Sequence, residues 1–194
     1  LRWELPPGWK KGVAMTASET HLQALKEKIT NRTAIVGVVG LGYVGLPFAV
    51  EKAKVGFRVI GVEQNPRRAE LVNRGESYIA DVPTEVLKEV VDKGLLRAET
   101  GFDRVAEMDV IVIAVPTPLT RNLTPDLQYV ERVTREIAPR LRPGQLISLE
   151  STTYPGTTEE LVLPMLQATG MKVGKDFFLA FSPERVDPGN PVFQ

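Results

Sequence analysis

A glycine-rich segment between an apolar run and a helical pattern constrains the fold of this chain more than any other feature. Residues 34–39 are almost wholly apolar, which is typical of a parallel strand buried on both faces. The next six residues, Gly40-Leu41-Gly42-Tyr43-Val44-Gly45, have the spacing Gly-x-Gly-x-x-Gly, and residues 43–55 can form a helix. A strand, a tight turn and a helix in this order predict the first βαβ unit of an open parallel sheet.

Strand-like and helix-like segments continue to alternate along the rest of the chain. The expected strands are residues 57–62, 96–99, 109–115, 145–149 and 177–181. The expected helices are residues 65–73, 83–93, 103–107, 127–141 and 157–168. Because parallel neighbours need crossover helices, this order predicts an α/β fold with a doubly wound, Rossmann-like parallel sheet.

The domain prediction divides the chain at residue 33. Thr16 and Glu19 match a capping box, so residues 1–33 are expected to form a tail and a short helix before a Rossmann domain at 34–194. The sequence stops just after a loop rich in proline and glycine, which we interpret as a boundary between domains.

Charge and composition argue against several classes of protein. Lys plus Arg and Asp plus Glu both number 24, so the chain lacks the basic excess of a nucleic-acid or anionic-membrane binder. The chain has no cysteine and one histidine, His21, which excludes disulfides, thiolate or multi-histidine metal sites and a cysteine nucleophile within it. The uncharged residues 34–50 approach a membrane span in length, but four glycines and Pro47 favour a strand, turn and helix. No signal peptide opens the sequence, and we expect a cytoplasmic protein.

The glycine spacing predicts an adenine dinucleotide at the first turn. Gly40 permits the tight turn, Gly42 lets backbone N–H groups approach a pyrophosphate, and Gly45 lets the helix pack closely. The fingerprint also needs an acid about 20 residues further on, and Glu63 meets this condition. A carboxylate there binds ribose hydroxyls and repels a 2′-phosphate, so NAD is favoured over NADP.

Three alternatives remain at this turn. Arg67 and Arg68 could accommodate the 2′-phosphate of NADP. S-adenosylmethionine and FAD use related glycine turns. Glu63 could instead cap the helix that follows it.

Polar loops follow the three later strands of the predicted sheet. They begin at Pro116, Glu150 and Ser182, and carboxyl ends of parallel strands share one edge. Each loop alone is also explained by turn chemistry, because Ser, Thr, Pro, Gly and Asn dominate turns. Together they favour a site beside the dinucleotide, in which Glu184 could act as a general base.

Four motifs in order resemble the UDP-glucose/GDP-mannose dehydrogenase family over about residues 35–190. They are Gly40-Leu41-Gly42-Tyr43-Val44-Gly45-Leu46-Pro47, Val115-Pro116-Thr117-Pro118, Ser151-Thr152-Thr153-Tyr154-Pro155-Gly156-Thr157 and Ser182-Pro183-Glu184-Arg185-Val186. The last two look most like the members that act on UDP-N-acetylglucosamine or UDP-N-acetylmannosamine. UDP-glucose and GDP-mannose remain alternative substrates.

The resemblance implies a four-electron oxidation of the sugar C6 alcohol to a carboxylate with two NAD. It implies that Thr152 and Glu184 position a water and assist proton transfer, and that Glu184, Arg185 and Val186 line the sugar-nucleotide pocket. We expect the cofactor to contact Gly40, Gly42, Tyr43, Val44, Gly45, Glu63, Arg68, Val115, Pro116, Thr117, Ser151 and Thr152.

The chain departs from the family pattern in two ways. Members usually carry Asp where this chain has Glu63, which lengthens the arm that reaches the ribose. The catalytic cysteine of the family lies in a downstream region that is absent here, so we expect a domain that is not competent alone and a homodimeric parent protein. A non-catalytic NAD-binding module is the alternative from another class. A hydroxyacid dehydrogenase fits less well, because such enzymes use a histidine or lysine base and His21 precedes the sheet.

Overall fold

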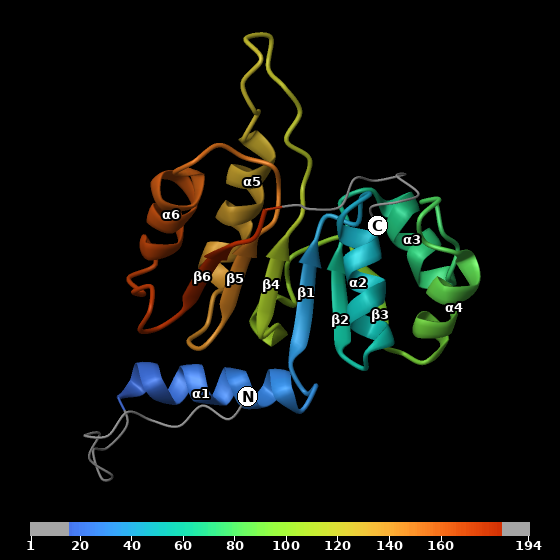
Figure 1. The fold of residues 1–194 in the computed structure, drawn as a ribbon, viewed down its shortest axis with the longest axis horizontal. Helices are drawn as coiled ribbons and strands as arrows, with labels where there is room; N and C mark the ends of the chain where they lie inside the picture. The colour runs from blue at the N-terminus through green and yellow to red at the C-terminus, as the bar shows by residue number, and fades with distance from the viewer. Residues whose placement is uncertain (1–15, 184–194) are drawn as a thin grey trace.

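Six parallel strands form one sheet in the order β3-β2-β1-β4-β5-β6 (Figure 1). The structure is a computed structural model that describes residues 16–183. The strands are β1 (Ile35–Val39), β2 (Arg58–Val62), β3 (Leu96–Glu99), β4 (Val110–Ile113), β5 (Leu146–Leu149) and β6 (Phe178–Phe181). The order reverses between β1 and β4, which confirms the predicted doubly wound fold.

Helices cover both faces of this sheet. They are α1 (Ala17–Thr30), α2 (Gly45–Lys54), α3 (Pro66–Arg74), α4 (Thr84–Asp92), α5 (Gln128–Ile137) and α6 (Leu163–Gln167). Three shorter helical segments are Val105–Glu107 and Ala138–Arg140, both 3₁₀, and Thr158–Val162, which is a π-helix. Successive side chains of a strand point to opposite faces, so Val38 packs with α2, α3 and α4 while Val39 packs with α5 and α6.

Several expected helices differ from the structure in bounds or type. The helix expected at 127–141 is α5 followed by the 3₁₀ segment Ala138–Arg140, and the one expected at 103–107 is only the 3₁₀ segment Val105–Glu107. The first crossover helix begins at Gly45 rather than at residue 43, because residues 40–44 form the glycine turn. The expected helix at 157–168 is divided into the π-helix and α6. Pro164 lacks the N–H that would continue the ordinary i→i+4 ladder, and the hydrogen-bond spacing changes at this point.

Helix α1 lies across the end of the sheet at which the strands begin (Figure 1). The predicted capping box is present, with Thr16 and Glu19 each accepting a backbone N–H of the other. His21 Nδ1 lies 3.3 Å from the carbonyl of Lys175, and Lys28 Nζ lies 2.7 Å from Asp109 Oδ1. These contacts attach α1 to the segments that lead into β6 and β4.

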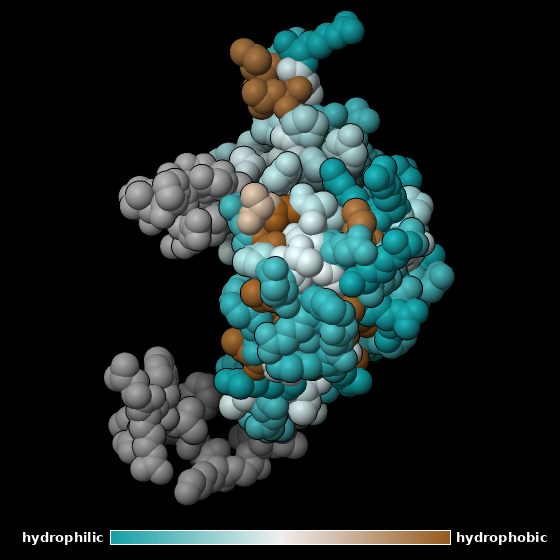
Figure 2. All heavy atoms as spheres, turned by 90° about the vertical axis from the view of Figure 1, so that its right-hand side faces the viewer, coloured by the Kyte–Doolittle hydropathy of each residue, from teal (hydrophilic) through white to brown (hydrophobic). Residues whose placement is uncertain are grey.

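A long loop between β4 and α5 extends beyond the rest of the molecule (Figure 1). Leu119 and Pro125 form an isolated antiparallel bridge, and the loop turns at Leu123, whose φ is 59°. Leu119 and Leu123 are 64% and 77% exposed, and Figure 2 shows hydrophobic atoms at this tip. For this segment, the sequence predicted only that the strand at 109–115 stops before Pro116 and Pro118. Within residues 16–183, no helix is long and apolar enough to cross a bilayer.

Candidate functional site

The glycine turn between β1 and α2 is shaped by close backbone contacts. Gly40 has a φ of 92° and donates its N–H to the carbonyl of Val62 at 2.9 Å. A Cβ added at Gly45 would lie 1.7 Å from the Gly40 carbonyl oxygen, so only glycine allows α2 to pack on the turn. A Cβ added at Gly42 would meet nothing within 4 Å. Gly40 and Gly45 therefore shape the turn, whereas Gly42 borders open space.

Helix α2 begins directly after this turn, and of its first three residues only Gly45 has a backbone N–H without a hydrogen bond among residues 16–183, because Leu46 donates to the Gly42 carbonyl at 3.0 Å and Pro47 has no N–H. Its N-cap, Val44, makes no side-chain capping bond, so the cap itself does not offset the positive end of the helix dipole. Such a helix start beside a glycine turn is suited to bind a phosphate group.

Glu63 directly follows β2 and borders the same space. The residue is 8% exposed, and its Oε1 accepts the backbone N–H of Asn65 at 2.9 Å. Asn65 caps α3, because its side-chain oxygen accepts the N–H groups of Arg67 at 3.0 Å and Arg68 at 3.3 Å. The alternative that Glu63 caps this helix is therefore wrong, and Glu63 is instead fixed at the cavity rim.

The loops after β4 and β5 are joined by two side chains. Ser151 Oγ donates to the carbonyl of Val115 at 2.8 Å and accepts its N–H at 3.0 Å. Thr117 Oγ1 donates to the carbonyl of Thr152 at 2.6 Å. Ser182, which follows β6, donates its N–H to the carbonyl of Leu149 at 3.0 Å. These three loops therefore begin side by side, and Glu184, Arg185 and Val186 lie outside the described residues.

A cavity of about 610 Å³ connects the glycine turn with these loops. Every residue that the sequence predicted to bind the cofactor lines it, with the exception of Gly45, which lies behind the turn. The predicted residues that line it are Gly40, Gly42, Tyr43, Val44, Glu63, Arg68, Val115, Pro116, Thr117, Ser151 and Thr152. The volume lies in the range of small-molecule and cofactor sites.

Other residues that line the cavity were not predicted to contact the cofactor. They are Val39, Val62, Gln64, Phe102, Ala114, Tyr129, Arg132, Val133 and Glu150. Gln64 and Glu150 adjoin predicted positions, and the carboxyl ends of β2 and β5 could have indicated them. Tyr129 and Arg132 lie on α5, and no local signal shows that this helix reaches the cavity.

The arrangement fits an adenine dinucleotide. Gly42 leaves space beside the uncapped start of α2, where a diphosphate would lie. Glu63 and Arg68 stand at the end of the cavity nearest β2, and Thr117 and Thr152 stand at the end nearest β4 and β5. Within residues 16–183, no cluster of three or more His, Cys, Asp or Glu could hold a metal ion. The chemistry of the described site is that of a dinucleotide pocket.

A family model and individual relatives both match this chain to nucleotide-sugar dehydrogenases. Residues 34–194 match the family model described as "UDP-glucose/GDP-mannose dehydrogenase family, NAD binding domain". UDP-N-acetyl-D-mannosamine dehydrogenase of Escherichia coli K12 is 40% identical over 171 residues, which cover 83% of this chain and 40% of that protein. UDP-N-acetyl-D-glucosamine 6-dehydrogenase of Pseudomonas aeruginosa is 36% identical over 80% of this chain and 36% of its own length.

Solved structures agree. The crystal structure of NDP-N-acetyl-D-galactosaminuronic acid dehydrogenase from Methanosarcina mazei Go1 matches with a TM-score of 0.79 and 34% identity. The match covers 91% of this chain and 38% of that chain. The chain thus spans less than half the length of the relatives that it matches.

Proposed function

The chain belongs to the UDP-glucose/GDP-mannose dehydrogenase family, as its NAD-binding domain, and we propose that it holds NAD for oxidation of the C6 hydroxyl of a UDP-N-acetylhexosamine to a carboxylate. The relatives named for UDP-N-acetyl-D-mannosamine and UDP-N-acetyl-D-glucosamine are 34–40% identical to it. The UDP-glucose dehydrogenase of Pyrobaculum islandicum is 34% identical. The N-acetylhexosamine class is proposed from the motifs at residues 151–157 and 182–186, because the identities overlap with that of the UDP-glucose enzyme.

The cavity provides a place for each part of the coenzyme, which accepts a hydride at its nicotinamide when bound. The N–H groups of Gly42 and Gly45 bind the diphosphate, because neither has a hydrogen bond within residues 16–183 and α2 directs its positive end there. Glu63 accepts hydrogen bonds from the adenosine ribose hydroxyls. Thr117 and Thr152 border the nicotinamide end.

Thr152 and Glu184 carry the proposed chemistry. Thr152 borders the cavity, and the bond from Thr117 to its carbonyl fixes the backbone there. Thr152 positions a water or the substrate hydroxyl, and Glu184 takes a proton from it. Glu184, Arg185 and Val186 follow Ser182, whose N–H bonds to the end of β5, so the loop that carries them starts beside the cavity.

We propose that turnover needs the remainder of a longer protein. Oxidation of an aldehyde to an acid benefits from a thiolate that holds the carbon covalently, and this chain contains no cysteine. The chain spans 40% or less of the relatives compared above. The complete enzyme is proposed to be a homodimer in the cytoplasm that forms through the part outside this chain.

The observation that carries the proposal is the single cavity that unites the glycine turn, Glu63 and the two joined loops. Calorimetric titration of the chain with NAD, NADH and NADP tests it, and we expect NAD and NADH to bind more tightly than NADP. Addition of the downstream region of a relative should then restore NADH production from UDP-N-acetylmannosamine or UDP-N-acetylglucosamine. An empty cavity at millimolar NAD, or binding of NADP alone, would contradict the proposal.

A further inference from the structure

Tyr78 lies outside the cavity but contacts the glycine turn directly. It belongs to the segment between α3 and α4, and its hydroxyl donates to the carbonyl of Leu41 at 2.6 Å. Leu41 is the middle residue of the first Gly-x-Gly and is fully buried. Its side chain packs on Gly61 of β2, where an added Cβ would lie 2.6 Å from Leu41 Cδ1. Leu41 is thus held by its side chain on one side and by its carbonyl on the other.

The carbonyl of Leu41 belongs to the same peptide group as the Gly42 N–H. This peptide is trans and planar, so the two groups point in opposite directions. A hydroxyl that holds the Leu41 carbonyl therefore turns the Gly42 N–H toward the opposite side. Gly42 lines the cavity, and within residues 16–183 no hydrogen bond occupies its N–H.

We propose that Tyr78 is a positioning residue for the coenzyme, because its hydroxyl fixes the Leu41–Gly42 peptide so that the Gly42 N–H faces the diphosphate. The proposal rests on the proposed function, which places NAD in this cavity. A hydrogen bond to a peptide carbonyl also polarises the peptide and makes its N–H a stronger donor. Tyr78 therefore orients the Gly42 N–H and strengthens it as a donor, although Tyr78 itself does not contact the ligand.

Two charged groups surround the Tyr78 ring. Arg68 Cζ lies 5.4 Å from the ring centroid in a cation–π contact, and Arg68 also lines the cavity. Burial, with a further contribution from the Glu63 carboxylate, raises the pKa of Tyr78 to about 12, although Arg68 opposes this shift. The hydroxyl therefore keeps its proton, and remains a donor, throughout the physiological pH range.

The test compares the affinities of Tyr78→Phe and wild type for ligands that contain the diphosphate and for a ligand that lacks it. Phenylalanine keeps the ring beneath Arg68 and removes only the donor. Loss of one neutral hydrogen bond corresponds to about a fivefold loss of affinity. We expect ADP-ribose and NADH to bind about fivefold more weakly, whereas adenosine, which lacks the diphosphate, keeps its affinity within about twofold. Tyr154→Phe is the matched control, because Tyr154 is half exposed and lies outside this cavity.

A second readout needs no ligand. In ¹H–¹⁵N spectra of the free protein, Tyr78→Phe should shift the Gly42 amide resonance, and Tyr154→Phe should leave it in place. Equal weakening of ADP-ribose and adenosine would indicate a merely structural role and overturn the proposal. Unchanged ADP-ribose affinity in Tyr78→Phe would overturn it while leaving the proposed function intact. A wild-type chain that binds neither ADP-ribose nor NADH would overturn both.

Discussion

Gly42 and Gly45 are the second and third glycines of the pattern, and the structure gives them different reasons to be glycine. A Cβ at Gly45 would collide with the Gly40 carbonyl, whereas a Cβ at Gly42 would enter open space. Gly45 is therefore needed for the fold, and we propose that Gly42 is needed for the ligand.

Alanine substitutions separate these two needs. We expect Gly45→Ala to lower the free energy of unfolding by about 2–3 kcal/mol, because α2 must move away from the turn. We expect Gly42→Ala to unfold at the wild-type urea concentration but to bind NADH about tenfold more weakly, because the methyl group fills space meant for the diphosphate. Urea titration and calorimetry measure the two effects. Normal NADH binding by Gly42→Ala would show that the diphosphate lies elsewhere.

Glu63 offers a second prediction for a single residue, which concerns the choice between NAD and NADP. Glu63→Gln keeps an Oε1 atom that can accept the Asn65 N–H, and it removes the negative charge at the rim. We expect the preference for NAD over NADP to fall about tenfold, because repulsion of the 2′-phosphate is lost. The ratio of the two dissociation constants measures this. Glu76→Gln, at an exposed residue outside the cavity, should leave that ratio unchanged.

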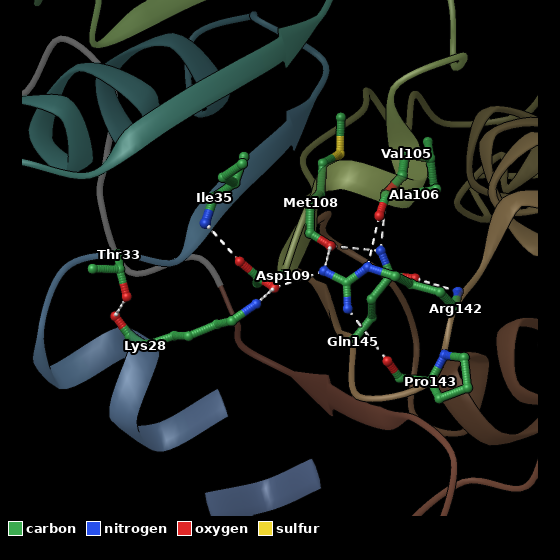
Figure 3. A network of polar contacts seen from close by, with 10 residues as sticks. All are labelled: Lys28, Thr33, Ile35, Val105, Ala106, Met108, Asp109, Arg142, Pro143 and Gln145. Atoms are coloured by element: carbon green, nitrogen blue, oxygen red, sulfur yellow. Dashed lines mark hydrogen bonds and ion pairs between the residues drawn. The ribbon is translucent and has the colours of Figure 1, made fainter. Parts of the chain in front are cut away.

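Among the secondary-structure elements, α1 and β4 are joined by one buried carboxylate (Figure 3). Asp109 accepts hydrogen bonds from Lys28 Nζ at 2.7 Å, from Arg142 Nη2 at 2.6 Å and from the Ile35 N–H at 2.9 Å. Arg142 also donates to the carbonyls of Ala106 and Met108. The network ties α1, β1, β4 and the loop before β5 together.

Removal of the carboxylate should therefore destabilise several elements at once. We expect Asp109→Ala to lower the free energy of unfolding by about 3 kcal/mol, because Lys28 and Arg142 lose their partner. Glu51→Ala is the control, because its bond to Lys54 is an exposed pair within one helix and contributes about 0.3–0.5 kcal/mol. Urea unfolding measures both. Equal losses in the two variants would contradict a special role for Asp109.

The same network predicts a pH dependence. Burial raises the pKa of Asp109, but the hydrogen bonds from Lys28, Ile35 and Arg142 outweigh burial and lower the pKa below its ordinary value. A lowered folded-state pKa means that this stabilisation is complete above the unfolded-state value and is lost as the pH falls through the folded-state value. The difference in unfolding free energy between wild type and Asp109→Asn should shrink between about pH 5 and pH 2. A constant difference over that range would contradict this assignment.

At the level of elements, the sequence predicted what depends on local pattern. Continuous apolar runs identified β1 and β4, and the capping box identified the start of α1. The π-helix and the extended loop at 117–127 were not predicted, because their shape depends on hydrogen-bond spacing and long-range contacts that composition does not encode. Tyr78 was missed for the same reason, since it is distant in sequence from Leu41.

At the scale of the whole molecule, one end of the sheet holds the buried ion-pair network and the other end holds the cavity. Lys28, Asp109 and Arg142 lie at the end where the strands begin, and the cavity lies at the end where they finish. The sheet between them is packed on both faces by buried, mostly aliphatic side chains. Stability and coenzyme binding should therefore be affected independently by substitutions at the two ends.

Coenzyme binding to destabilised variants tests this independence. NADH at a hundred times its dissociation constant adds about 2.7 kcal/mol to the free energy of unfolding, because it binds only the folded chain. For a chain of this size that gain raises Tm by about 5–10 °C.

Asp109→Ala should melt at a lower temperature than wild type but gain the same free energy from NADH, since distant sites add independently. Gly42→Ala should show the opposite result, with a wild-type Tm in the absence of ligand and a smaller gain at the same NADH concentration. A reduced gain in Asp109→Ala, measured by calorimetry at matched NADH, would show that the sheet couples its two ends.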